Sequence, residues 1–148
     1  MRKEWSKNWI SSKQPRKQRK YRYNAPLHVR HKFVSAHMSK DLIRQHGRRA
    51  FPVRKGDEVE VTRGEFAGFK GVVNRVNLSS LKVYVEGVTV KKVDGSEVLR
   101  ALEPSNLRIT KLILDDKFRL KAINRKKESV KPIEKAGTKK EKHEATKK

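Results

Sequence analysis

The sequence contains no cysteine and no long hydrophobic run. Without cysteine, disulfides and thiolate metal sites are excluded, so neither can stabilise a small fold. The longest apolar stretch is three residues, as at 83–85, whereas a membrane helix needs about 18 or more. No secretory signal peptide can be drawn either. We therefore expect a soluble cytoplasmic protein with no membrane insertion.

Acidic residues are scarce, above all near the N-terminus. Residues 1–50 carry 15 Lys/Arg against 2 acids, 51–111 carry 11 against 8, and 112–148 carry 13 against 6. A solvated surface normally mixes both signs, so the first third predicts a polyanionic partner, namely nucleic acid. With 148 residues, 34% of them hydrophobic, the chain has room for one small core. We expect the basic arm to be largely disordered when it is free of its partner.

The segment Lys13–Pro26 combines cations with two tyrosines. It shows no helical or strand periodicity, and its two prolines favour an extended path along a phosphate backbone. Tyr21 and Tyr23 alternate with cations and can offer rings to unpaired bases. Packing of the two tyrosines on the barrel surface is an equal alternative.

A short helix is predicted near 40–46, at the end of the basic arm that we assign to residues 1–50. Ser39 is a suitable N-cap, Asp41 lies in the first turn, and Gly47 can close the C-terminus. The chain then enters the core domain through 51–52.

Alternating valines predict short strands between residues 51 and 112. The alternation is typical of half-buried strands, and a hairpin turn at Asp94-Gly95 and a turn at 104–106 separate the later ones. Five or six strands at this spacing predict a mainly β fold, a small SH3-like barrel with short flanking helices. Asp115-Asp116 begins a helix assigned to 113–128, and 129–148 is predicted to be a disordered basic tail.

A glycine-rich loop at 64–71 joins two of these strands. Its glycines tolerate positive φ and permit close approach, and Arg63, Lys70 and Arg75 could converge on one barrel edge to contact phosphates. In the alternative interpretation the glycines only shape a turn and Phe66 and Phe69 belong to the core, which we favour for the phenylalanines. The run from 54 to 86 has the pattern of the KOW motif of RNA-binding barrels.

No enzymatic or cofactor site is predicted. The loop matches neither phosphate-binding glycine pattern, and His28, His31 and His37 lie in cationic surroundings that disfavour a metal. No cofactor is therefore expected. The acids show no spacing to a Ser, His or Lys that would indicate catalysis, and they are Asp57, Glu58, Glu60, Glu65, Glu86 and Glu97.

Five ordered segments together carry a family resemblance: Lys13–Lys20, Asn24–Arg30, Ser39–Leu42, Val53–Val59 and Pro104–Asn106. The chain closely resembles, over about 12–128, the KOW-containing protein family of the large ribosomal subunit in its archaeal and eukaryotic form. The amino-acid sequences of the 55–57 turn and of the 67–71 loop favour the archaeal form. Trp5 and Trp9 lie outside the pattern and could make a lineage-specific contact.

The resemblance implies an SH3-like barrel that binds the 5′ region of the large ribosomal RNA early in subunit assembly. It further implies neighbouring ribosomal proteins as partners and a position near the nascent-chain exit, close to targeting factors. A KOW-type elongation factor is the runner-up, but it normally carries a folded α/β domain ahead of its barrel, which residues 1–50 cannot supply. A nucleic-acid-modifying enzyme would need a set of catalytic residues, and the sequence shows no spacing that indicates one.

The residues expected to bind RNA are the cations, rings and loop glycines of these segments. They are Lys13, Arg16, Lys17, Arg19, Lys20, Tyr21, Arg22, Tyr23, His28, Arg30, His31, Lys32, Arg48, Arg49, Arg54, Lys55, Arg63, Gly64, Gly68, Lys70, Gly71, Arg75, Lys91 and Lys92.

Overall fold

A mixed β-sheet forms the centre of the molecule. The computed structural model describes residues 5–6, 9 and 12–129, and within them seven strands are ordered β2-β1-β7-β3-β4-β5-β6. The strands are β1 (Ser35–Met38), β2 (Ala50–Pro52), β3 (Glu58–Val61), β4 (Lys70–Asn77), β5 (Lys82–Lys91), β6 (Glu97–Leu102) and β7 (Leu107–Lys111). Among these seven described strands, only β1 and β7 pair in parallel. The mainly β prediction is confirmed, and the sheet is open, with β2 and β6 at its two edges in the described chain.

The core follows from the alternation of valines along the strands. Val59 and Val61 are buried on β3, and Val83 and Val85 on β5, while the residues between them stay partly exposed. Ile123 of α4 (Lys117–Ser129) packs into the same cluster. Each such side chain contributes about 1.5–3 kcal/mol through its removal from water, so the sheet and α4 share one hydrophobic core.

The sheet begins earlier than the predicted boundary at residue 51. Strand β1 lies wholly within the stretch assigned to the arm, and β2 begins one residue ahead of that boundary, which gives seven strands where five or six were predicted. Ala36 and Met38 are buried, but four residues are too few to show an alternation that can be recognised in a cationic segment. Pairing of Met38 with Ile109 of β7, far along the chain, holds β1 in place.

Residues 15–24 form a helix, so the predicted extended path is wrong. Helix α1 (Pro15–Asn24) is followed by α2 (Leu27–Phe33), which was not predicted. Proline is well tolerated at the first helical position, where its missing N–H costs nothing, and Arg, Lys and Gln are good helix formers. Helix α1 buries no residue, so its sequence has no apolar stripe from which a helix could be recognised.

The helix predicted after Ser39 is confirmed as α3 (Lys40–His46). The Ser39 side chain accepts a hydrogen bond from the Leu42 N–H at 3.3 Å. Gly47 ends the helix in the left-handed region with φ of 65°. Both ends are therefore set by local side-chain and backbone chemistry.

The helix predicted after Asp115-Asp116 is confirmed as α4. The Asp116 carboxylate accepts the Phe118 N–H at 2.9 Å, as a residue at a helix start does. A 3-10 turn, η1 (Pro104–Asn106), precedes β7. Most of the predicted tail, 130–148, lies outside the described residues.

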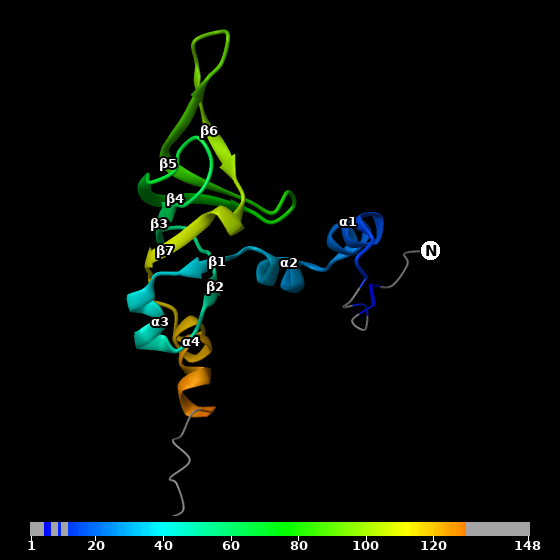
Figure 1. Cartoon of the computed structure of the whole chain (residues 1–148), viewed down its shortest axis with the longest axis vertical. Coiled ribbons are helices and arrows are strands. Elements are labelled where there is room, and N and C mark those ends of the chain that lie inside the picture. Colours follow the sequence, from blue (N-terminus) through cyan, green and yellow to red (C-terminus); the bar gives the residue numbers. More distant parts are fainter. Residues whose placement is uncertain (1–4, 7–8, 10–11, 130–148) are drawn as a thin grey trace, which may run out of the picture.

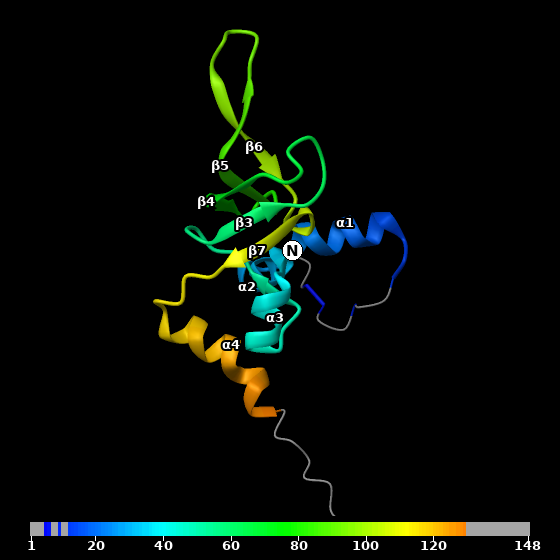
Figure 2. The same cartoon turned by 60° about the vertical axis from the view of Figure 1, so that its left-hand side comes forward.

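Three projections leave the sheet in different directions. Figure 1 shows the β5–β6 hairpin at one end, α4 at the opposite end, and α1 with α2 to one side, and Figure 2 again shows the hairpin and α4 at opposite ends with α1 to one side. At the hairpin turn the Ser96 hydroxyl and N–H donate to Asp94 and lower the pKa of its carboxyl group. None of the described helices is both long and apolar enough to cross a membrane.

Candidate nucleic-acid interface

Helix α1 carries the densest positive charge of the described chain. Its ten residues include five cations and no acid, and all five cations are exposed. A ten-residue helix is about 15 Å long, which spaces these charges closely enough to face successive phosphates. The cations are Arg16, Lys17, Arg19, Lys20 and Arg22, with Lys13 exposed just ahead of them.

Several cations of the sheet and of the segments beside it are paired with acids. Carboxylates lie within 4 Å of Arg54, Arg108 and Lys111, at distances of 3.4, 3.5 and 3.1 Å, and Lys82 pairs with Glu103. In the part of the chain that the structure describes, no ion pair involves α1. Helix α1 therefore presents charge that no acid of the described chain offsets.

The two tyrosines of α1 have different surroundings. Tyr23 is 80% exposed, whereas the Tyr21 ring lies 4.8 Å from Trp5, 4.7 Å from Trp9 and 5.9 Å from Phe33, centroid to centroid. The Trp5 indole N–H donates to the Tyr21 carbonyl at 3.2 Å. The alternative of packing on the barrel surface is therefore wrong for both tyrosines, because Tyr21 packs on the N-terminal tryptophans and α2 and Tyr23 is exposed.

Arg30 fixes the turn between α1 and α2. Its Nε–H donates to the Ala25 carbonyl at 2.9 Å, and an Nη2–H donates to the Tyr23 carbonyl. These bonds satisfy carbonyls at the end of α1, which would otherwise lack partners. Arg30 thus has a structural task besides its predicted RNA contact, whereas His28, His31 and Lys32 on the same helix are exposed.

The other predicted cations are distributed over several surfaces. Arg48 is half-buried, and its Nε has no hydrogen-bond partner within the described residues. Arg49 and Lys55 are exposed near α3 and β3, and Lys91 and Lys92 are exposed on the hairpin. The structure therefore does not gather the predicted residues into one patch.

Two of the three cations at the glycine-rich loop lie along β4, while Arg63 is exposed between β3 and β4. Lys70 begins β4 opposite Glu60, and Arg75 lies five residues further on, with its guanidinium carbon 4.5 Å from the centre of the Tyr84 ring. At about 3.3 Å per strand residue the two positions are roughly 16 Å apart. Lys70 and Arg75 can therefore face different phosphates, and their convergence with Arg63 on one edge of the sheet stays a prediction.

Gly68 and Gly71 are needed for different reasons. Gly68 has φ of 86°, which other residues rarely adopt, whereas Gly71 has no positive φ. A Cβ on Gly71 would lie 2.8 Å from both the Glu86 carbonyl oxygen and the Val85 side chain. The close approach at Gly71 is therefore made by the neighbouring strand β5 of the same sheet.

The two phenylalanines of the loop also differ. Phe66 is partly buried against the core, in line with the favoured interpretation. Phe69 is 37% exposed, so its assignment to the core is wrong. Its ring lies over Gly71 and Gly87, where a Cβ would come within 3.0 and 2.6 Å of it, and it fills the space that two glycines leave.

Gly71→Val is expected to lower the free energy of unfolding by about 1–3 kcal/mol, the usual cost of overpacking. Because the clash lies within the sheet, RNA affinity measured well below the melting temperature should not change. Chemical denaturation and RNA titration check this. Lys70→Ala is the matched control, since loss of one exposed cation should weaken binding slightly and leave stability intact. A Gly71→Val protein with full stability and impaired binding would contradict the packing role.

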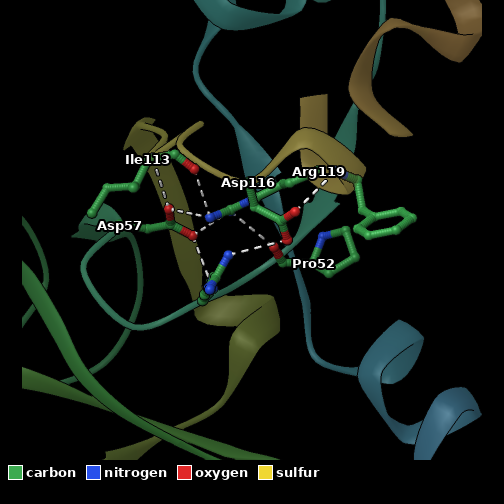
Figure 3. Close-up of polar contacts among 7 residues, drawn as sticks. Pro52, Asp57, Ile113, Asp116 and Arg119 are labelled. Carbon is green, nitrogen blue, oxygen red and sulfur yellow. Dashed lines mark hydrogen bonds and ion pairs between the residues drawn. The ribbon is translucent and has the colours of Figure 1, made fainter. Parts of the chain in front are cut away.

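One buried ion pair was not predicted. Asp57 is fully buried and accepts both Arg119 Nη groups, at 2.9 and 2.6 Å (Figure 3). Its carboxylate also accepts the backbone N–H groups of Arg54 and Ile113, and Arg119 donates further to the carbonyls of Ile113 and Pro52. Each oxygen of the Asp57 carboxylate accepts two hydrogen bonds. The ion pair therefore fixes α4 to the segment just before β3.

No metal-ligating group is assembled from residues 5–6, 9 and 12–129: no three His, Asp or Glu side chains there could hold an ion together. The described surface is that of a small basic domain with one densely cationic helix.

The chain belongs to the family of ribosomal proteins described as L26 in eukaryotes and as the L24 type in archaea, whose profile matches residues 12–126. It is 52% identical over 115 residues to large ribosomal subunit protein uL24 of Methanosphaera stadtmanae, covering 78% of this chain and 98% of the relative. It is also 50% identical over 117 residues to the protein of that name from Methanocella arvoryzae, covering 79% and 94%. The predicted family and its archaeal form are confirmed.

Proposed function

We propose that this chain is a structural component of the large ribosomal subunit and binds the large ribosomal RNA mainly through α1. The carrying observation is the density of unpaired charge: α1 holds five exposed cations without an ion pair in the described chain, whereas Lys82, Arg108 and Lys111 of the sheet are paired with carboxylates. Family membership supports a ribosomal setting, since the relatives are named as proteins of that subunit.

The finer parts of the proposal come from the family resemblance. They are binding to the 5′ region of the large ribosomal RNA, a role in early subunit assembly, and a position near the nascent-chain exit. Neighbouring ribosomal proteins are proposed as further partners, and targeting factors as proteins that pass close by. Nothing in this role requires a catalytic group, so we propose a binding function without enzymatic activity.

The physical mechanism is the release of counterions from RNA. Each phosphate that a lysine or arginine neutralises releases roughly 0.7–0.9 of a condensed counterion. A helix with five such cations docks as one rod, and the Arg30 bonds hold its far end against α2. The exposed loop and hairpin cations then add contacts from the sheet.

The affinity for RNA is expected to fall steeply with salt. If the five α1 cations each meet one phosphate, they contribute about −4 to the slope of log affinity against log salt concentration. Titration of the full chain with an RNA fragment from the 5′ domain, over a range of salt concentrations, measures this slope. A nearly flat plot would contradict phosphate binding.

Sedimentation tests whether the chain is associated with the large ribosomal subunit in cells. The tagged chain in extract of its own cells should move with the large subunit through a sucrose gradient and stay with it after a low-salt wash. Recovery only in the soluble fractions at the top of the gradient would overturn the ribosomal proposal.

A further inference from the structure

A cavity of about 300 Å³ lies beside α1 and is built in part from residues outside the family match. One face of α1 lines it with Lys17, Lys20, Tyr21 and Asn24. The spacing of three, four and seven residues places these side chains on one stripe of the helix. Trp5 and Trp9 from the N-terminal extension complete the lining, together with Ser6. The extension therefore adds a surface to α1 that the matched range of the family does not include.

The aromatic side of the cavity is held in place. Tyr21 contacts both indole rings and Phe33 of α2, and the Trp5 N–H is bonded to the Tyr21 backbone. Trp5 and Trp9 are half-buried, so part of each indole ring remains exposed to solvent. Such fixed, partly open rings suit stacking with a flat ligand, because little conformational freedom is lost on binding.

The polar side supplies the complementary chemistry. Lys17 and Lys20 are exposed at the rim, and none of the described residues that line the cavity is a carboxylate, so the charge of this lining favours an anion. Asn24 offers both a donor and an acceptor that can read the edge of a base. Stacking rings, an amide and two ammonium groups match the base and phosphate of a nucleotide. Two lysines beside the rings disfavour a cationic ligand.

We propose that this cavity binds an unpaired nucleobase of RNA together with an adjoining phosphate. The inference rests on the proposed RNA binding and deepens it, because it assigns a base-stacking site to a segment outside the family match. Volume agrees with this ligand, since binding cavities of small ligands are about 300–1,000 Å³.

Tryptophan fluorescence tests the site directly. The chain has two tryptophans, and both line this cavity, so intrinsic emission reports on it alone. The unmodified full chain is titrated with single-stranded decaadenylate and with an abasic decamer of the same length and charge. A stacked base should remove much of the emission, whereas the abasic strand should bind through phosphates and leave emission nearly unchanged.

Each result separates the two proposals. An equal response to both strands, or saturable binding of decaadenylate without a change in emission, overturns the stacking site and leaves phosphate binding by α1 standing. A failure of both strands to bind overturns both proposals. Equal quenching by decaglutamate would show that the cavity takes acidic peptides and would also overturn the inference.

A variant measures the contribution of one ring. Trp9→Leu is expected to weaken decaadenylate binding on the order of tenfold, the usual effect of losing one stacked base, without changing affinity for the abasic strand. Phe118→Leu is the matched control, because Phe118 is 85% exposed on α4 and lies outside the cavity. Equal losses for both strands would mean that Trp9 only supports α1.

Discussion

Asp57→Ala is expected to lower the free energy of unfolding by about 3–5 kcal/mol, because the Arg119 guanidinium would stay buried without its partner. The substitution also orphans the N–H groups of Arg54 and Ile113, which the carboxylate now accepts. The total free energy of unfolding of a small domain is about 5–15 kcal/mol, so the variant should melt at a much lower temperature than the parent. Chemical denaturation followed by circular dichroism measures the loss.

Glu58→Ala is the matched control for this prediction. Glu58 is the next residue and pairs with Lys111 at 3.1 Å, but both side chains are well exposed to water. An exposed pair contributes about 0–1 kcal/mol, so this variant should stay close to the parent. Similar stabilities for the two variants would refute the role of the buried pair. Asp57→Leu combined with Arg119→Met should recover part of the loss, because it leaves no charge buried.

Reversing Arg16, Lys17, Arg19 and Lys20 to glutamate is expected to weaken RNA binding at least a hundredfold at low salt. It should also reduce the salt slope by roughly one for each phosphate contact removed. The sheet should keep its stability, because α1 buries none of its residues. RNA titration at several salt concentrations and a thermal melt measure the two effects separately.

The control reverses four lysines of the C-terminal segment, namely Lys139, Lys140, Lys147 and Lys148. This variant has the same net charge as the α1 variant, so any difference between the two depends on position. If both lose affinity equally, overall charge drives binding and α1 is not the interface. A folded α1 variant that binds like the parent would remove the basis of the proposed function.

Local chemistry made part of the fold predictable. The α3 boundaries follow from Ser39 and Gly47, whose cap contacts lie within one turn of the helix. The alternation at Val83 and Val85 likewise predicted a strand, because burial of every second residue is visible in the sequence itself. Where the structure of a residue is determined by its neighbours in the chain, the sequence pattern was sufficient to predict it.

Other elements depend on contacts that the sequence does not display. Asp57 and Arg119 are 62 residues apart, and neither position has a pattern that points to the other. Asp57 was considered only as one of several acids without a catalytic partner. Helix α1 was missed for the opposite reason, since it packs no face on the core and so has no apolar period. Its cations were nevertheless recognised as a charged group, because charge needs no tertiary partner to be recognised, and their binding to RNA stays a prediction.

The Arg30 bonds also determine how two binding surfaces act together. They tie α2 to the last carbonyls of α1 through backbone oxygens at 25 and 23. For an RNA that contacts both α1 and the sheet, binding at one surface holds the other at a high effective concentration, because the linker between them is stiff and has a set length. Without Arg30 the same cations would be joined by a flexible tether. Two contacts of unchanged local strength would then yield a weaker complex, purely through lost avidity.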